Sequence, residues 1–102
     1  MSQKINLALQ ILPRSDKTDT YALVDKAIEV IQKSGVKYKV CPFETVLEGE
    51  YEQLMKIVKE AQEACFSAGA SDLMVYIKIQ RSNKKDVAIE DKMKKYSWGE
   101  LT

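Results

Sequence analysis

The chain has 102 residues, 45% hydrophobic and 30% charged, and its 16 basic and 15 acidic side chains leave a net charge of +1. This length predicts a single domain over residues 1–102, because half of it would be too small to bury a core. Charges of both signs are interspersed, which argues against nucleic acid as a partner, since that needs a basic stripe. No apolar run approaches the ~20 residues that span a bilayer. With no signal peptide at the N-terminus either, we expect a cytoplasmic protein and no membrane partner.

The residue types that are absent exclude several chemistries. Histidine does not occur, which removes the usual general base, the usual zinc ligand and any Ser-His-Asp arrangement. The two cysteines, Cys41 and Cys65, lack CxxC spacing, and we expect them to be buried or half-buried fillers. Glycine-rich phosphate loops are also missing. We therefore predict no metal site, no cofactor and no catalytic residue.

The first half of the chain predicts a strand and a helix. Residues 4–12 alternate between apolar and polar positions, which indicates a half-buried strand that Pro13 ends. After a polar loop, Asp19 or Thr20 caps a helix that ends before Gly35. The apolar stripe of this helix comprises Val24, Ala27, Ile28 and Ile31.

The second half predicts a hairpin, a helix, a strand and a final helix. Strands over 36–41 and 45–49 are joined by Pro42-Phe43-Glu44, which is a hairpin-length connection. A helix over about 50–68 follows, and residues 73–79 alternate as a fourth strand. The spacing of the apolar positions after residue 88 predicts a short last helix; these positions are Ile89, Met93 and Tyr96.

The order of these elements, βαββαβ plus a C-terminal helix, predicts an α+β ferredoxin-like fold. Both crossover helices then cover one face of the sheet, and the first and third strands are central. The covered face should hold Ile5, Leu7, Leu9, Ile11, Tyr38, Val40, Leu47, Leu73, Val75, Ile77 and Ile79. The other face, which we call the open face, mixes polar residues with Ala8, Val46, Met74 and Tyr76. Such a mixed face suggests a subunit interface or a ligand floor.

Polar side chains on the open face suggest a ligand site. Gln10, Glu48 and Tyr76 offer an amide, a carboxylate and a phenol to a flat heteroaromatic ligand, and the carboxylate would favour a cationic ring. The alternatives are a solvated sheet face or a plain dimer contact. Thr45 has the opposite parity to Glu48, so its hydroxyl could reach a ligand beside the turn or merely cap the hairpin.

The segment 34–50 carries a more specific signal. Ser34-Gly35, Lys37-Tyr38-Lys39-Val40, Pro42 and then Thr45-Val46-Leu47-Glu48-Gly49-Glu50 resemble the thiamine-binding protein family, and the resemblance extends from Lys4 to Tyr96. Many members carry Gly or Asn where Glu44 stands. The resemblance implies a ferredoxin-like subunit that assembles through its sheets and binds thiamine or its hydroxymethylpyrimidine moiety without catalysis. Carried over by position, Thr45 and Glu48 are the ligand-binding candidates; Gln10, Tyr76 and Phe43 are added from the expected geometry.

We thus expect a non-enzymatic cytosolic binding protein for thiamine or hydroxymethylpyrimidine, acting in salvage, buffering or delivery. Its partners would be this small molecule and further copies of itself, as a homodimer or homotetramer. The alternative is an ACT- or PII-like regulatory module, although the sequence predicts neither the second domain nor the long loop usual there. An acylphosphatase would need glycine in the loop 13–16, where none occurs. An RNA-binding sheet would need aromatic residues on its central strands, where we find none.

Overall fold

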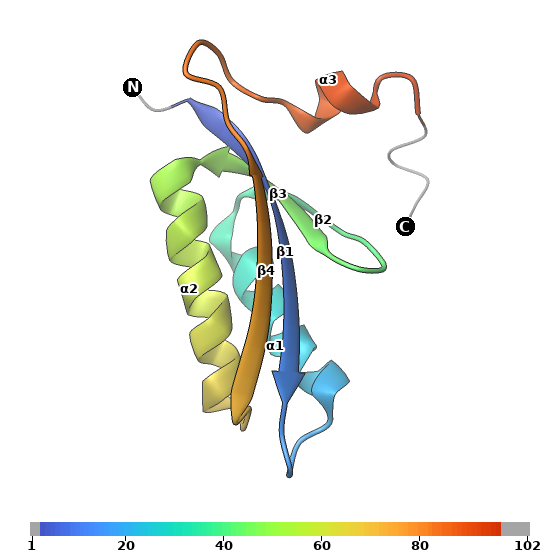
Figure 1. The fold of residues 1–102 in the computed structure, drawn as a ribbon, viewed down its shortest axis with the longest axis vertical. Helices are drawn as coiled ribbons and strands as arrows, with labels where there is room; N and C mark the ends of the chain where they lie inside the picture. The colour runs from blue at the N-terminus through green and yellow to red at the C-terminus, as the bar shows by residue number, and fades with distance from the viewer. Residues whose placement is uncertain (1–2, 97–102) are drawn as a thin grey trace.

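The computed structural model describes residues 3–96, which form a four-stranded antiparallel sheet with two long helices on one face (Figure 1). The strand order is β2-β3-β1-β4. In chain order the elements are β1 (Lys4–Arg14), α1 (Thr20–Ser34), β2 (Lys37–Val40), β3 (Thr45–Glu50), α2 (Tyr51–Ser67), β4 (Asp72–Gln80) and α3 (Ile89–Met93). The predicted α+β ferredoxin-like fold with a short C-terminal helix is therefore confirmed.

The two long helices end where the sequence indicates, but the predicted apolar stripe of α1 was partly wrong. Asp19 is the N-cap residue of α1, and Gly35 ends the helix with a left-handed φ of 82°. The buried positions of α1 are Leu23, Ala27 and Ile31, spaced by four. Leu23, which the predicted stripe omits, is fully buried, and the predicted Val24 and Ile28 are only half-buried. The buried face of α1 is therefore shifted by one residue position from the predicted face, toward Leu23.

The predicted end of the first strand was also wrong. β1 continues through Pro13, which lies opposite Leu73 of β4, and ends at Arg14. The register of β1 with β3 stops at the pair of Leu9 and Thr45, so at Pro13 the strand has a neighbour on one side only. A proline, which lacks an N–H donor, is tolerated in a strand that is unpaired on one side. The other strand and helix boundaries lie within a residue or so of the prediction, except that α3 ends at Met93 and Tyr96 follows it in a turn.

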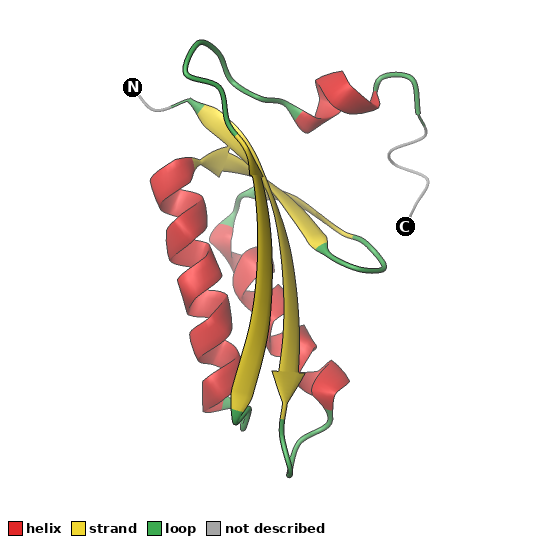
Figure 2. Ribbon diagram, in the orientation of Figure 1, coloured by secondary structure: helices red, strands yellow, loops and turns green. Residues whose placement is uncertain are grey.

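The core lies between the sheet and the pair α1 and α2, which Figure 2 shows on the same side of the strands. Its sheet-side residues come mainly from the central strands and are Ile5, Leu7, Leu9, Ile11 and Leu47. Four residues predicted for this face, Tyr38, Val40, Ile77 and Ile79, are exposed instead. They belong to the edge strands β2 and β4, beyond the width that two helices cover.

The segment after β4 crosses to the other side of the sheet, where α3 lies apart from the two long helices (Figure 2). It first runs beside the start of β1: the Val87 N–H donates to the Lys4 carbonyl at 2.9 Å, and Asp86 accepts from the Lys4 N–H at 2.7 Å. Within residues 3–96, no helix is long and apolar enough to cross a membrane.

Candidate functional site

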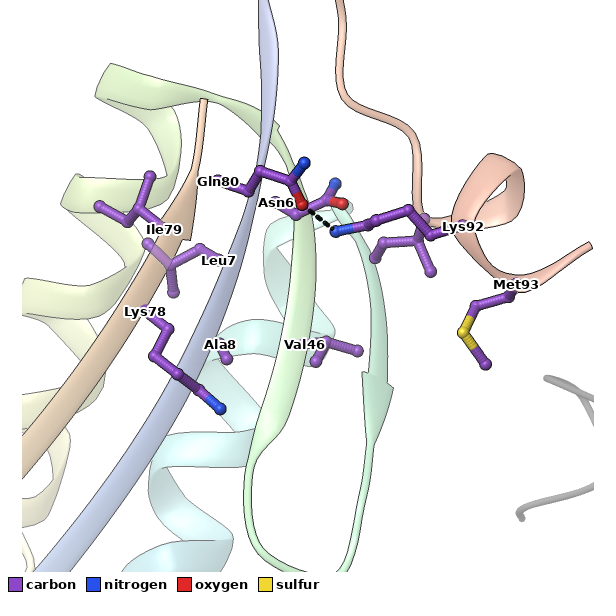
Figure 3. A pocket seen from close by; sticks show the side chains of 10 residues that line it. Asn6, Leu7, Ala8, Val46, Lys78, Ile79, Gln80, Lys92 and Met93 are labelled. Carbon is purple, nitrogen blue, oxygen red and sulfur yellow. Dashed lines mark hydrogen bonds between the residues drawn. The ribbon is translucent and has the colours of Figure 1, made fainter. Parts of the chain in front are cut away.

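A cavity of about 300 Å³ lies between the open face of the sheet and α3 (Figure 3). The register explains its floor, because Ala8 on β1 stands opposite Val46 on β3 and opposite Lys78 on β4. The short side chain of Ala8 leaves the space that its longer neighbours enclose. The lining residues are Asn6, Leu7, Ala8, Val46, Lys78, Ile79, Gln80, Ile89, Lys92 and Met93.

The wall that α3 contributes is held in place by Glu48. A carboxylate oxygen of Glu48 accepts a hydrogen bond from the Ile89 N–H at 2.6 Å and a longer one from Asn6 Nδ2 at 3.4 Å. Asn6 Nδ2 also donates to the Val87 carbonyl at 2.8 Å. Glu48 lies on the open face, as predicted, but here it binds the backbone at the first residue of α3.

Asn6 is a residue that sequence reasoning placed on the open face without proposing it for the site. It is only 7% exposed and lines the cavity. Its Oδ1 atom is buried without a hydrogen-bond partner among residues 3–96. A buried polar atom in this state normally has a partner, so a donor that reached Oδ1 would satisfy it. The signal in the sequence was that an amide on a central strand stands in register with Glu48.

Two lysines, Lys78 and Lys92, line the cavity, and a third, Lys37 on β2, bonds to α3. Lys37 bonds Glu90 on α3, and this hydrogen bond raises the pKa of Lys37 in spite of some desolvation, with the charges of Glu90 and Glu48 acting in the same direction. Lys78 Nζ lies 3.3 Å from the Glu44 carboxylate. Lys92 Nζ donates to the Gln80 side-chain oxygen at 2.7 Å, the bond that is drawn in Figure 3.

The other predicted site residues lie away from this cavity. Thr45 is buried and shares a face with Leu47, so it faces the α1 side while Glu48 faces the open side. Thr45, Phe43 and Gln10 all line a second cavity of about 480 Å³ between α1 and the β2–β3 turn.

Tyr76 completes the predicted set. It is exposed on β4 in register with Gln10. The structure thus groups Thr45, Phe43 and Gln10 at one cavity and leaves Glu48 beside the other.

Candidate metal ligands are not grouped within residues 3–96. No group of three or more Cys, Asp or Glu side chains there could hold a metal ion. Cys41 is half-buried and Cys65 buried, both as free thiols, which confirms their prediction as fillers. Burial raises the pKa of the Cys65 thiol.

Fold and cavity together define the class: a ferredoxin-like α+β domain with a ligand-sized hollow on the uncovered face of its sheet. Residues 7–97 match a family described as thiamine-binding protein. The chain belongs to this family, as the resemblance of the segment 34–50 suggested.

The relatives support the assignment over almost the whole length. A UPF0045 protein of Clostridium perfringens is 42% identical over 91 residues, which cover 89% of this chain and 95% of the relative. A solved domain of unknown function from Bacillus cereus has a TM-score of 0.92 at 45% identity, covering 94% of this chain and 92% of its own. A Thermotoga maritima structure whose name proposes a role in thiamine biosynthesis or salvage has a TM-score of 0.80 at 29% identity. The match covers 90% of this chain and 97% of that structure's chain.

Proposed function

We propose that this protein binds thiamine or its hydroxymethylpyrimidine moiety in the cavity between the open face and α3, without catalysing a reaction. In the cytoplasm it would serve salvage, buffering or delivery of that ligand. Family membership supports the ligand class, and so does the name of the Thermotoga maritima relative. The single observation that carries the location is the unpartnered acceptor of Asn6 in a cavity with an apolar floor.

The cavity suits one substituted aromatic ring. Its volume of about 300 Å³ lies at the lower end of the range, roughly 300–1,000 Å³, typical of ligand pockets. Ala8 and Val46 offer a flat apolar surface to a ring face, and the Met93 thioether suits contact with an aromatic edge. An aminopyrimidine carries an amino group, and this donor matches Asn6 Oδ1. Leaving a buried acceptor unpaired costs about 1–3 kcal/mol, so satisfying Oδ1 would contribute to affinity.

The residues predicted from the sequence enter this proposal in different ways. Glu48 would act by holding α3 over the ring, and its charge would favour the amino side of the ligand. Tyr76 continues the open face beyond the cavity, where it could contact the rest of thiamine. Gln10, which stands opposite Tyr76 in the sheet and also lines the second cavity, could contact a ligand at either place. Thr45 and Phe43 line the second cavity, so they would contact only a ligand that extends into it.

Assembly into a homodimer or homotetramer is part of the same proposal. The edge strands β2 and β4 each have one side unpaired in the single chain. Leu12, Met74 and Tyr76 are exposed apolar side chains on the open face, and such residues suit contact with a second copy.

Calorimetric titration with thiamine and with hydroxymethylpyrimidine tests the proposed function. We expect saturable heat with about one site per chain for at least one of the two. Ala8→Leu should abolish it by filling the cavity, whereas Ala22→Leu, an equal enlargement at an exposed position of α1, should leave it unchanged. No heat from either compound with folded protein would overturn the proposal and leave the regulatory-module alternative.

A further inference from the structure

We infer that the cavity selects the phosphorylated form of its ligand, a phosphomonoester on the ring's side chain, over the free alcohol. This inference rests on the proposed function for the ring itself. Of the ten residues that line the cavity, Lys78 and Lys92 carry positive charge and none carries a carboxylate. A site that binds only a cation would be expected to be lined by carboxylates and not by lysines.

Lys92 is the principal anion-binding group because its charge is not neutralised. Its bond goes to the neutral amide oxygen of Gln80, and it forms no ion pair with a carboxylate within residues 3–96. The acidic residues beside it on α3 are engaged elsewhere, since Glu90 pairs with Lys37 and Asp91 pairs with Lys94. An ammonium group at a cavity wall with only an amide partner can donate to a phosphate oxygen without losing an ion pair.

Lys78 contributes a second positive charge from the opposite side. Figure 3 shows Lys78 and Lys92 reaching toward the cavity from β4 and from α3, with Ala8 and Val46 between them. The partner of Lys78, Glu44, does not line the cavity. The Lys78 side chain is 75% exposed, so this pair is weak and Lys78 is free to turn toward an anion.

The geometry of the ligand connects this charge to the ring site. In hydroxymethylpyrimidine the amino group and the hydroxymethyl group are on neighbouring ring carbons. Asn6 and Lys92 both lie at the Gln80 end of the cavity (Figure 3). An amino group at Asn6 Oδ1 therefore directs the neighbouring oxygen, and a phosphate on it, toward the Lys92 ammonium. A phosphomonoester carries a charge of about −1.5 to −2 near neutral pH, which two lysines would balance.

Four compounds separate this inference from the proposed function: thiamine, thiamine monophosphate, hydroxymethylpyrimidine and its phosphate, each titrated calorimetrically at low and at high salt. At low salt we expect hydroxymethylpyrimidine phosphate to bind about tenfold tighter than hydroxymethylpyrimidine, and the ratio to shrink with salt because the lysines are exposed. Thiamine monophosphate carries its phosphate on the thiazolium side chain, away from the pyrimidine amino group, so we expect no comparable gain over thiamine. If hydroxymethylpyrimidine phosphate bound no more tightly than hydroxymethylpyrimidine, the inference would be overturned and the proposed function would stand. No binding of any of the four would overturn both.

A matched pair of variants tests the assigned residue. Lys92→Gln should reduce the preference for phosphate, which is the ratio of the affinities for the phosphorylated and the free compound, to about threefold or less. Lys95 lies just after α3, is exposed and does not line the cavity. Lys95→Gln removes one positive charge there and should keep the preference for phosphate. Equal losses in the two variants would show a general effect of net charge and would overturn the role of Lys92.

Discussion

Removing the Glu48 side chain should release α3 from the sheet while leaving the core intact. In Glu48→Ala the Ile89 N–H loses its acceptor at 2.6 Å, and Asn6 loses its weaker contact at 3.4 Å. The Asn6 bond to the Val87 carbonyl remains. The loss is therefore concentrated at the first turn of α3.

The size of the effect follows from the kind of bond. A hydrogen bond to a charged group contributes about 1.5–3 kcal/mol, and the half-buried position of Glu48 places this one near the lower part of that range. A loss of about 2 kcal/mol corresponds to a ~30-fold larger population of the detached segment. Glu48→Gln keeps an acceptor oxygen but loses the charge. Charged hydrogen bonds are about twice as strong as neutral ones. The population of the detached segment should therefore rise only about fivefold in Glu48→Gln.

Native-state hydrogen exchange of the Ile89 amide measures this population directly. We expect its protection to fall by the stated factors in the two variants, with the amide of Leu47 in β3 unchanged as a reporter of global stability. Glu50→Ala, which removes an exposed carboxylate from the end of the same strand, is the control and should leave Ile89 unaffected. Unchanged protection of Ile89 in Glu48→Ala, or an equal loss at Leu47, would refute the idea that Glu48 anchors α3.

Three further predictions concern other parts of the fold. In urea unfolding, Gly35→Ala should lower the free energy of unfolding by about 1 kcal/mol through its positive φ alone, since a Cβ there meets nothing within 4 Å. Gly69→Ala should lower it more, because the φ of Gly69 is 118° and a Cβ would lie 2.7 Å from a threonine hydroxyl. In thiol labelling with a disulfide reagent, Cys41 should react quickly, and the buried Cys65, whose pKa is raised, only on unfolding. The carboxylate of Glu90 on α3 raises the pKa of Lys37 above its ordinary 10.5. The ion pair between Lys37 and α3 should therefore be intact below pH 10.5 and be lost as the pH rises through the raised pKa. The NMR methyl signal of the methionine on α3 should report that loss, and the step should vanish in Lys37→Gln.

Hydrophobic periodicity was enough to predict the fold, because the elements that define it are strongly patterned. The alternation of β1 and the stripe of α2 required no tertiary information, and the order of elements then fixed which strands are central. Pro13 was misread because a proline ends a strand only where both sides are paired, and pairing is a property of the sheet. The edge residues Ile77 and Ile79 were placed on the correct face, but their exposure depends on how far the helices extend.

The site could be predicted less well because it depends on where α3 returns to the sheet. The parity of β3 correctly separated Thr45 from Glu48, and the structure shows the consequence, which is that the two side chains lie on opposite faces. Asn6 and Lys92 were not proposed because they acquire a role only when α3 packs over the open face. A contact between segments more than 80 residues apart, such as that of Asn6 with Val87, leaves no local pattern in the sequence.

This dependence on α3 has a consequence for how a ligand would bind. α3 has five residues, which is too short to be stable as an isolated helix, so its position comes from its contacts with the sheet. Those contacts include the burial of Ile89 and the bonds of Glu48 to the Ile89 N–H, of Lys37 to Glu90 and of Lys92 to Gln80. A ligand that bridges Lys92 and the floor of the cavity would add one more contact between the same two parts. By linkage, such a ligand must stabilise α3 in its closed position to the same extent that closure strengthens binding.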